Sequence, residues 1–183
     1  SKISITAPGN MTYGKNTKLS VVQLSGGDEN TQENVTSTVD YFVEKLSDVT
    51  NKYETATDEE YTIEAGVFTP KTTGRFNITA KKDNVSDSAV IHVDKGLITI
   101  SADDQTSSVN KERNDLTASI VGYASFDESK INNLTPGTDY EVQSDAISTD
   151  AAGDYIVYPV LKNTDKMQDL QNLYSIILEK GLY

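Results

Sequence analysis

The sequence predicts an all-β protein made of two tandem antiparallel β-sandwiches, residues 1–95 and residues 96–183, joined by a short linker. Apolar and polar residues alternate with a period of two along much of the chain, which is typical of half-buried strands. A phrase also recurs: residues 91–98 and residues 176–183 both run from an apolar strand end through an acid into Lys-Gly-Leu, at an offset of 181 − 96 = 85 residues. This spacing indicates that one small module follows another. Because the second copy falls at the end of the sequence, we expect a piece of a longer array.

The first half contains short candidate strands that are rich in β-branched and aromatic residues. They are residues 19–24, 35–43, 61–63, 66–68, 75–80 and 89–93. Polar clusters at residues 26–34 and residues 51–60 predict loops. Short strands separated by turns at such intervals indicate an antiparallel sandwich.

The second half is expected to repeat this plan. Its candidate strands are residues 97–100, 116–121, 140–142, 155–160 and 174–178. Residues 127–131 predict one helical turn. Residues 164–173 are also expected to be briefly helical, but this segment is too short and too polar to anchor a domain.

A second correspondence supports the alignment of the two halves. Residues 74–78 and residues 153–157 each place a turn glycine before an aromatic residue and, two positions on, an aliphatic residue, at an offset of 153 − 74 = 79. Side chains two residues apart in a strand point to the same face. We therefore expect the aromatic and the aliphatic side chain of both segments to enter the cores.

Charge and composition exclude several classes of partner. The 183 residues include 16 basic and 28 acidic side chains, for a net charge of −12, so phosphate-rich partners such as nucleic acid and anionic membranes are not expected. No apolar run reaches the roughly 18 residues that a membrane span needs, and we expect any targeting signal or anchor to lie outside this sequence. The chain has no cysteine, so no disulfide stabilises it.

A family resemblance is carried by residues 11–14, residues 68–70, residues 74–80, residues 98–105, residues 133–140 and the final Gly181-Leu182-Tyr183. These segments resemble the repeats of bacterial surface proteins. The first half is similar to the Ig-like repeats of these proteins, and the second half resembles the MBG-type repeat of long bacterial adhesins. Val109-Asn110 stands where members often carry a Tyr-Gly pair. The resemblance implies two Ig-like β-sandwich domains in an extracellular, tandem, non-catalytic array, and it transfers no functional residue.

Similar surface modules carry an intramolecular Lys–Asn isopeptide bond, which restricts the unfolded chain as a disulfide does. Lys18 and Lys45 lie in or beside candidate strands. The sequence does not show which lysines and asparagines are buried together.

The sequence contains no catalytic constellation, and we expect no enzyme activity. His92 is the single histidine, so a catalytic triad or a histidine-bound metal would depend on it. It alternates with Ile91 and Val93 in a candidate strand, which predicts an outward-facing side chain with a structural or surface role.

Acidic side chains are the candidates for a calcium site, although solvated loop carboxylates are the more ordinary interpretation. Asp94, Asp103 and Asp104 lie near the joint between the modules, where an ion would stiffen the chain. A second acidic cluster occupies residues 58–60. Neither has the alternating spacing of a calcium-binding loop, and we expect no cofactor.

Tyrosines are the candidates for ligand contact, because a tyrosine ring offers an apolar face and a hydroxyl to a sugar. The chain has ten tyrosines and no tryptophan. Tyr53, Tyr123 and Tyr140 lie near candidate loops. Core or edge packing in strands is the alternative for each.

Three functions remain open from the sequence. The first is a non-catalytic stalk or adhesion segment of a bacterial cell-surface or secreted multidomain protein, with neighbouring modules of the same chain as partners. The second is a module that binds host or environmental glycans or matrix proteins through loops at residues 26–34, 51–60 or 123–140. The third is an accessory domain of a large secreted hydrolase.

Overall fold

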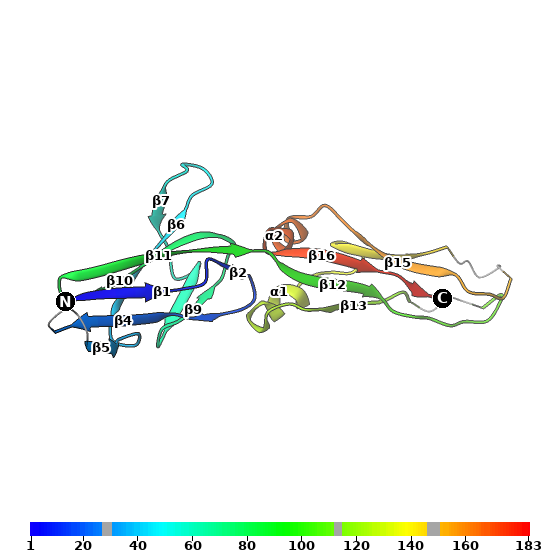
Figure 1. The fold of residues 1–183 in the computed structure, drawn as a ribbon. Helices are drawn as coiled ribbons and strands as arrows, with labels where there is room; N and C mark the ends of the chain where they lie inside the picture. The colour runs from blue at the N-terminus through cyan, green and yellow to red at the C-terminus, as the bar shows by residue number, and fades with distance from the viewer. Residues whose placement is uncertain (27–30, 112–114, 146–150) are drawn as a thin grey trace. The chain divides into compact units, whose positions relative to one another are not determined.

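The computed structural model describes residues 1–26, 31–111, 115–145 and 151–183. The chain forms two compact units, Ser1–Lys95 and Gly96–Tyr183 (Figure 1). Both units consist mainly of strands arranged in sheets, so the predicted all-β class with Ig-like β-sandwiches is confirmed. One residue, Lys95, separates the last strand of the first unit from the first strand of the second.

One layer of the first unit has the strand order β1-β4-β5, continued by β3-β9-β8. These strands are β1 (Lys2–Thr6), β3 (Thr17–Lys18), β4 (Ser20–Ser25), β5 (Thr31–Asn34), β8 (Tyr61–Glu64) and β9 (Val67–Pro70). Leu19, between β3 and β4, donates its backbone N–H to the oxygen of Gly66 at 2.8 Å. This bond continues the β3–β9 pairing to the residue that connects β3 with β4, so the two sheets follow one another in one layer.

The opposite layer of the first unit has the strand order β2-β11-β10-β6-β7. Its strands are β2 (Asn10–Thr12), β6 (Asp40–Leu46), β7 (Tyr53–Thr55), β10 (Gly74–Lys82) and β11 (Val85–Asp94). In chain order, the two layers correspond to the ABED and GFCC′ sheets of an immunoglobulin domain. One expectation is corrected here, since β2 pairs with β11 in parallel and not antiparallel.

The core of the first unit lies between these layers and follows the alternation in the sequence. Phe76, Ile78 and Ala80 on β10 are fully buried. The ring of Phe76 meets that of Phe68 edge to face at 5.3 Å between centroids, a favourable aromatic geometry. The prediction for residues 74–78 is therefore confirmed.

The expected strand at residues 35–43 is wrong in its first half. Residues 36–38 form a turn, and β6 begins at Asp40. The cause is local hydrogen bonding by Thr36, whose hydroxyl donates to Asn34 Oδ1 at 2.7 Å and accepts the N–H of Val21 at 2.9 Å. A buried threonine bonded in this way gives the backbone an alternative to the sheet ladder.

The two expected loops also contain strands. Part of the first, residues 31–34, forms β5, and residues 27–30 lie outside the described residues. Part of the second forms β7, which pairs with β6 from Glu44↔Thr55 to Leu46↔Tyr53. Both strands are short and exposed, so their polar sequences do not show the alternation of a half-buried strand.

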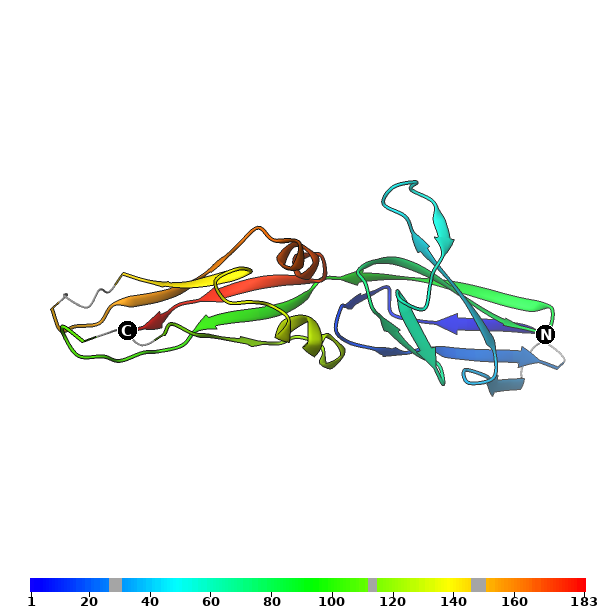
Figure 2. The same cartoon turned by 180° about the vertical axis from the view of Figure 1, so that it is seen from behind.

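The second unit contains two three-stranded sheets, with the orders β13-β12-β16 and β14-β15-β17. Its strands are β12 (Gly96–Ala102), β13 (Ala118–Val121), β14 (Tyr140–Ser144), β15 (Ile156–Leu161), β16 (Tyr174–Glu179) and β17 (Gly181–Leu182). The first and last of the expected strands pair in parallel, β12 with β16, and the two views in Figures 1 and 2 show them side by side. The chain then changes sheets, because β17 pairs with β15.

Helices close part of the second unit. A 3₁₀ turn, η2 (Ser125–Asp127), leads into α1 (Glu128–Asn132), as the sequence predicts. Helix α2 (Asp165–Leu173) packs more firmly than expected, because Met167, Leu170 and Leu173 recur at intervals of three and are buried. An apolar stripe of this spacing lies on one face of a helix and outweighs the polar composition of the segment.

The two segments compared at residues 74–78 and residues 153–157 do not behave alike. Val157 is fully buried, as expected. Tyr155 is half-buried, and its hydroxyl donates to the backbone oxygen of Ala151 at 2.7 Å in an exposed position. In the second unit the expected burial is therefore confirmed for the aliphatic residue Val157 and wrong for the aromatic residue Tyr155.

Candidate functional site

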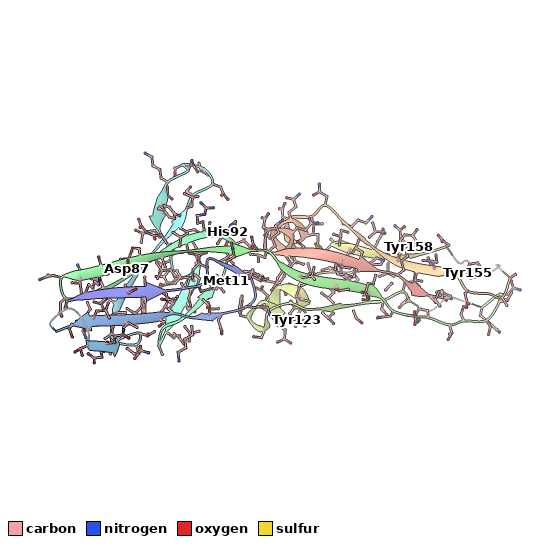
Figure 3. The ribbon with its side chains drawn as sticks, in the orientation of Figure 1. Met11, Asp87, His92, Tyr123, Tyr155 and Tyr158 are labelled. Atoms are coloured by element: carbon pink, nitrogen blue, oxygen red, sulfur yellow. The ribbon has the colours of Figure 1, made fainter. Side chains whose placement is uncertain are left out.

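The single histidine lies on the outward face of β11, as its alternation predicts. Figure 3 marks His92 on β11. Its Nε2 lies 3.6 Å from Asp94 Oδ1, and Arg75 on β10 is its cross-strand partner. Within the described residues, no group of three or more His, Asp or Glu side chains is placed to hold a metal ion. His92 therefore belongs to a polar surface of the first unit.

The three candidate calcium ligands are divided between the units, with Asp94 in the first and Asp103 and Asp104 in the second. The carboxylate of Asp103 accepts hydrogen bonds from the hydroxyls of Thr117 at 2.7 Å and Ser119 at 2.8 Å. Asp104 Oδ1 accepts the N–H of Leu182 at 2.8 Å. These bonds hold the edge of β13 and the end of the chain. A calcium role for the three aspartates stays a prediction.

The three candidate tyrosines occupy different environments. Tyr53 on β7 is 37% exposed, and Tyr123 is half-buried in the segment after β13 (Figure 3). Tyr140 is only 7% exposed, and burial followed by the negative charge of Asp103 raises its pKa. Tyr140 therefore presents no open ring to a ligand, whereas Tyr53 does.

The β6–β7 hairpin extends away from the rest of the first unit in both views (Figures 1 and 2). Val49 at its tip is 93% exposed. The tip is held by Ser47, whose hydroxyl accepts the N–H groups of Val49 and Thr50 at 3.2 Å, and whose backbone oxygen accepts the N–H of Asn51 at 2.9 Å. A hydrogen-bonded turn that presents an apolar side chain and a neighbouring tyrosine is a surface that a protein or sugar partner can contact.

An open groove of about 370 Å³ lies at the base of this hairpin. It is lined by Val39, Asp40, Tyr41, Asp58, Tyr61, Thr62, Ile63 and Glu64. Burial raises the pKa of Tyr41, and burial together with the negative charge of Asp58 raises that of Tyr61. Both phenols therefore stay protonated at neutral pH. The lining of the groove combines two tyrosines with three carboxylates, and these negative charges disfavour the binding of anions.

The sequence pattern did not identify the hairpin tip or Tyr41 as candidate binding residues. Residues 47–52 are polar except for Val49, and Tyr41 fell inside the strand expected at residues 35–43. The sequence feature that did point to the groove is the acidic cluster at residues 58–60, since Asp58 lines it.

A buried polar centre lies in the second unit. The hydroxyl of Tyr174 donates to Asp127 Oδ2 at 2.6 Å and accepts the N–H of Ala124 at 2.8 Å. Asp127 is 1% exposed, and Lys130 Nζ lies 3.3 Å from its other carboxylate oxygen. Burial, followed by the bond to Asp127, raises the pKa of Tyr174 far above its usual range. These bonds fix the start of β16 to the α1 segment, which is a structural role.

Comparisons with known proteins give matches among solved structures. No protein-family model matches the chain, and no curated protein matches it. The N-terminal four Ig domains of Dscam1 isoform 9.44 align over 99% of this chain and 44% of theirs, at 10% identity and a TM-score of 0.38. A structure of Dscam solved for its isoform specificity gives 9% identity, a TM-score of 0.37, and coverage of 100% and 45%.

The N-terminal eight Ig domains of Down Syndrome Cell Adhesion Molecule isoform 1.30.30 align over 100% of this chain and 26% of theirs, at 10% identity and a TM-score of 0.34. The chain thus spans less than half the length of these structures. The likeness is one of fold. The Ig-like assignment of the first unit rests on its own strand order. In the described ranges, no helix is long and apolar enough to cross a membrane.

Proposed function

We propose that this chain is a non-catalytic structural and adhesive segment of an extracellular multidomain protein. The observation that carries the proposal is the tandem arrangement, in which one residue, Lys95, separates β11 from β12. So short a connection suits a chain of modules that spaces other domains. The sequence resemblance to Ig-like and MBG-type repeats supports a bacterial cell-surface or secreted parent protein.

A second function, binding of a glycan or matrix protein, is favoured by the β6–β7 hairpin. Its tip presents Val49 on a turn fixed by hydrogen bonds, with Tyr53 on the adjoining strand. Rigid loops on a sandwich commonly carry binding residues, because little entropy is lost when they meet a partner.

The test is a binding screen of the purified chain against immobilised glycans, mucin and matrix proteins, with and without calcium. The variants Val49→Asp and Tyr53→Ala alter the hairpin, and Phe42→Ala removes a ring that is 56% exposed on the same strand pair, away from the tip. Saturable binding that is lost in the first two variants and kept in the third supports the binding module. No binding in a folded sample supports the structural segment alone. Turnover of any immobilised substrate would refute the non-catalytic assignment.

A further inference from the structure

We infer that the second unit resists tension along the chain, through the parallel pairing of its first strand, β12, with β16, the strand before the final β17. This inference deepens the proposed structural function and rests on it for its biological meaning. The pairing itself is a property of the fold.

Strand direction decides how a pulling force acts on this unit. Because β12 and β16 are parallel neighbours, the start of β12 and the end of β16 lie at opposite ends of the pair. A force applied before β12 and after β16 slides one strand past the other and loads their hydrogen bonds together. In an antiparallel pair the two loaded ends would lie at the same end, and the bonds would open one after another.

The β12–β16 pairing includes every residue of β16. Its register runs through six pairs, from Gly96↔Tyr174 to Ser101↔Glu179. At the far end, Ser101 Oγ donates to Glu179 Oε2 at 2.9 Å. Between these ends, Ile98 and Ile100 on β12 are fully buried, so sliding also exposes apolar surface to water.

Further bonds reinforce both ends of β16. At its start, Tyr174 is anchored through its hydroxyl to Asp127 and Ala124. Beyond its end, Leu182 donates to Asp104 Oδ1 and accepts the N–H of Gln105, each at 2.8 Å. A pull on the end of the chain therefore meets resistance before it reaches the ladder.

The same arrangement occurs in the first unit, in a shorter form. There β2 and β11 are parallel through three pairs, from His92↔Asn10 to Asp94↔Thr12. Two flanking bonds extend them, from the N–H of His92 to Gly9 O at 2.9 Å and from that of Tyr13 to Asp94 O at 2.8 Å. In both units a strand near the beginning thus pairs in parallel with a strand near the end, β2 with the final β11 in the first unit and β12 with β16 in the second.

Single-molecule force spectroscopy on the whole chain separates sliding from peeling. The chain has no cysteine, so two introduced cysteines give defined attachment points for DNA handles. Lys95→Cys with Lys180→Cys places the handles before β12 and after β16, which imposes sliding. Ser107→Cys with Lys180→Cys places both handles beyond the C-terminal ends of the two strands, which imposes peeling. All three positions are exposed, so the two variants should keep the same urea midpoint.

We expect the second unit to unfold at a force at least about twofold higher in the sliding geometry, at one loading rate, because forced unfolding reports the barrier along the pulling direction and not the equilibrium stability. Equal forces in the two geometries, or a higher force on peeling, would overturn the inference. The binding screen does not bear on this result. A chain that binds a partner but yields equally in both geometries would keep its adhesive function and lose the tension-bearing one.

Discussion

Tyr174→Phe removes one hydroxyl that satisfies two buried partners in the second unit. The ring stays, but the N–H of Ala124 loses its acceptor and Asp127 Oδ2 loses a donor. Leaving the buried N–H of Ala124 unsatisfied costs about 1–3 kcal/mol, and the loss of one hydrogen bond to the buried carboxylate of Asp127 adds to this cost. Asp127 keeps Lys130 at 3.3 Å, so its share falls at the lower end. We therefore expect a loss of about 3 kcal/mol in the unfolding free energy of the second unit.

For a domain of this size, that loss corresponds to a fall of roughly 12–24 °C in Tm. Calorimetry of the whole chain should show the transition of the second unit moving down while that of the first unit stays in place. The matched control is Tyr155→Phe, which deletes an exposed hydroxyl bonded to Ala151 O and should cost less than about 0.5 kcal/mol.

The raised pKa of Tyr174 gives a second readout of the same bonds. Above pH about 10 the unfolded chain loses its phenol protons, whereas folded Tyr174 keeps its proton, so the stability of the second unit should fall as pH rises. Tyr174→Phe should weaken that slope. A small shift in Tm, equal to that of Tyr155→Phe, would refute the reasoning that this hydroxyl satisfies two buried groups.

Three further substitutions test other parts of the fold. Phe76→Ala should cost the first unit about 3–5 kcal/mol in urea unfolding, against less than about 0.5 kcal/mol for exposed Phe42→Ala, and similar losses would contradict the core assignment. Gly122→Ala should lower the Tm of the second unit, because φ is +96° and the new Cβ would lie 2.7 Å from a backbone oxygen. In the control Gly153→Ala the new Cβ meets open space, so the Tm should not change. A larger fall in Tm for Gly153→Ala than for Gly122→Ala would count against this geometry. The hydrogen bond from Thr164, followed by that from the Thr135 N–H, lowers the pKa of Asp139, so the second unit should lose stability as pH falls below about 5. Urea unfolding at a series of pH values should show that Asp139→Asn reduces this loss of unfolding free energy at acid pH. An unchanged loss would exclude Asp139 as its source.

Alternation predicted the strands that contribute to the cores, because burial of one face leaves a period of two in the sequence. Residues 75–80 illustrate this, since every second side chain from Phe76 to Ala80 is fully buried. Alternation does not predict the structure where side-chain hydrogen bonds replace the sheet ladder, as at Thr36, or where strands are exposed on both faces, as in β5 and β7. Neither case leaves a periodic pattern.

The candidate site was less predictable than the fold. A tyrosine near a loop in the sequence can point inward, as Tyr140 does, or outward, as Tyr53 does, and only the register of its strand decides between them. Val49 gave no signal, because a single apolar residue in a polar stretch is ordinary on a surface. Its exposure becomes informative only when the turn that holds it is seen.

The repeated Lys-Gly-Leu phrase has a structural reason that the sequence did not reveal. In each copy the lysine separates two strands: Lys95 lies between β11 and β12, and Lys180 lies between β16 and β17. At the second copy the chain leaves the sheet of β12 and joins the sheet of β15. Gly181 makes this change of sheet feasible, since a Cβ there would lie 2.5 Å from Ala102 O. The glycine thus permits the close approach that ties the exit of the second unit to its entry strand, and this contact lies on the path of the tension inferred above.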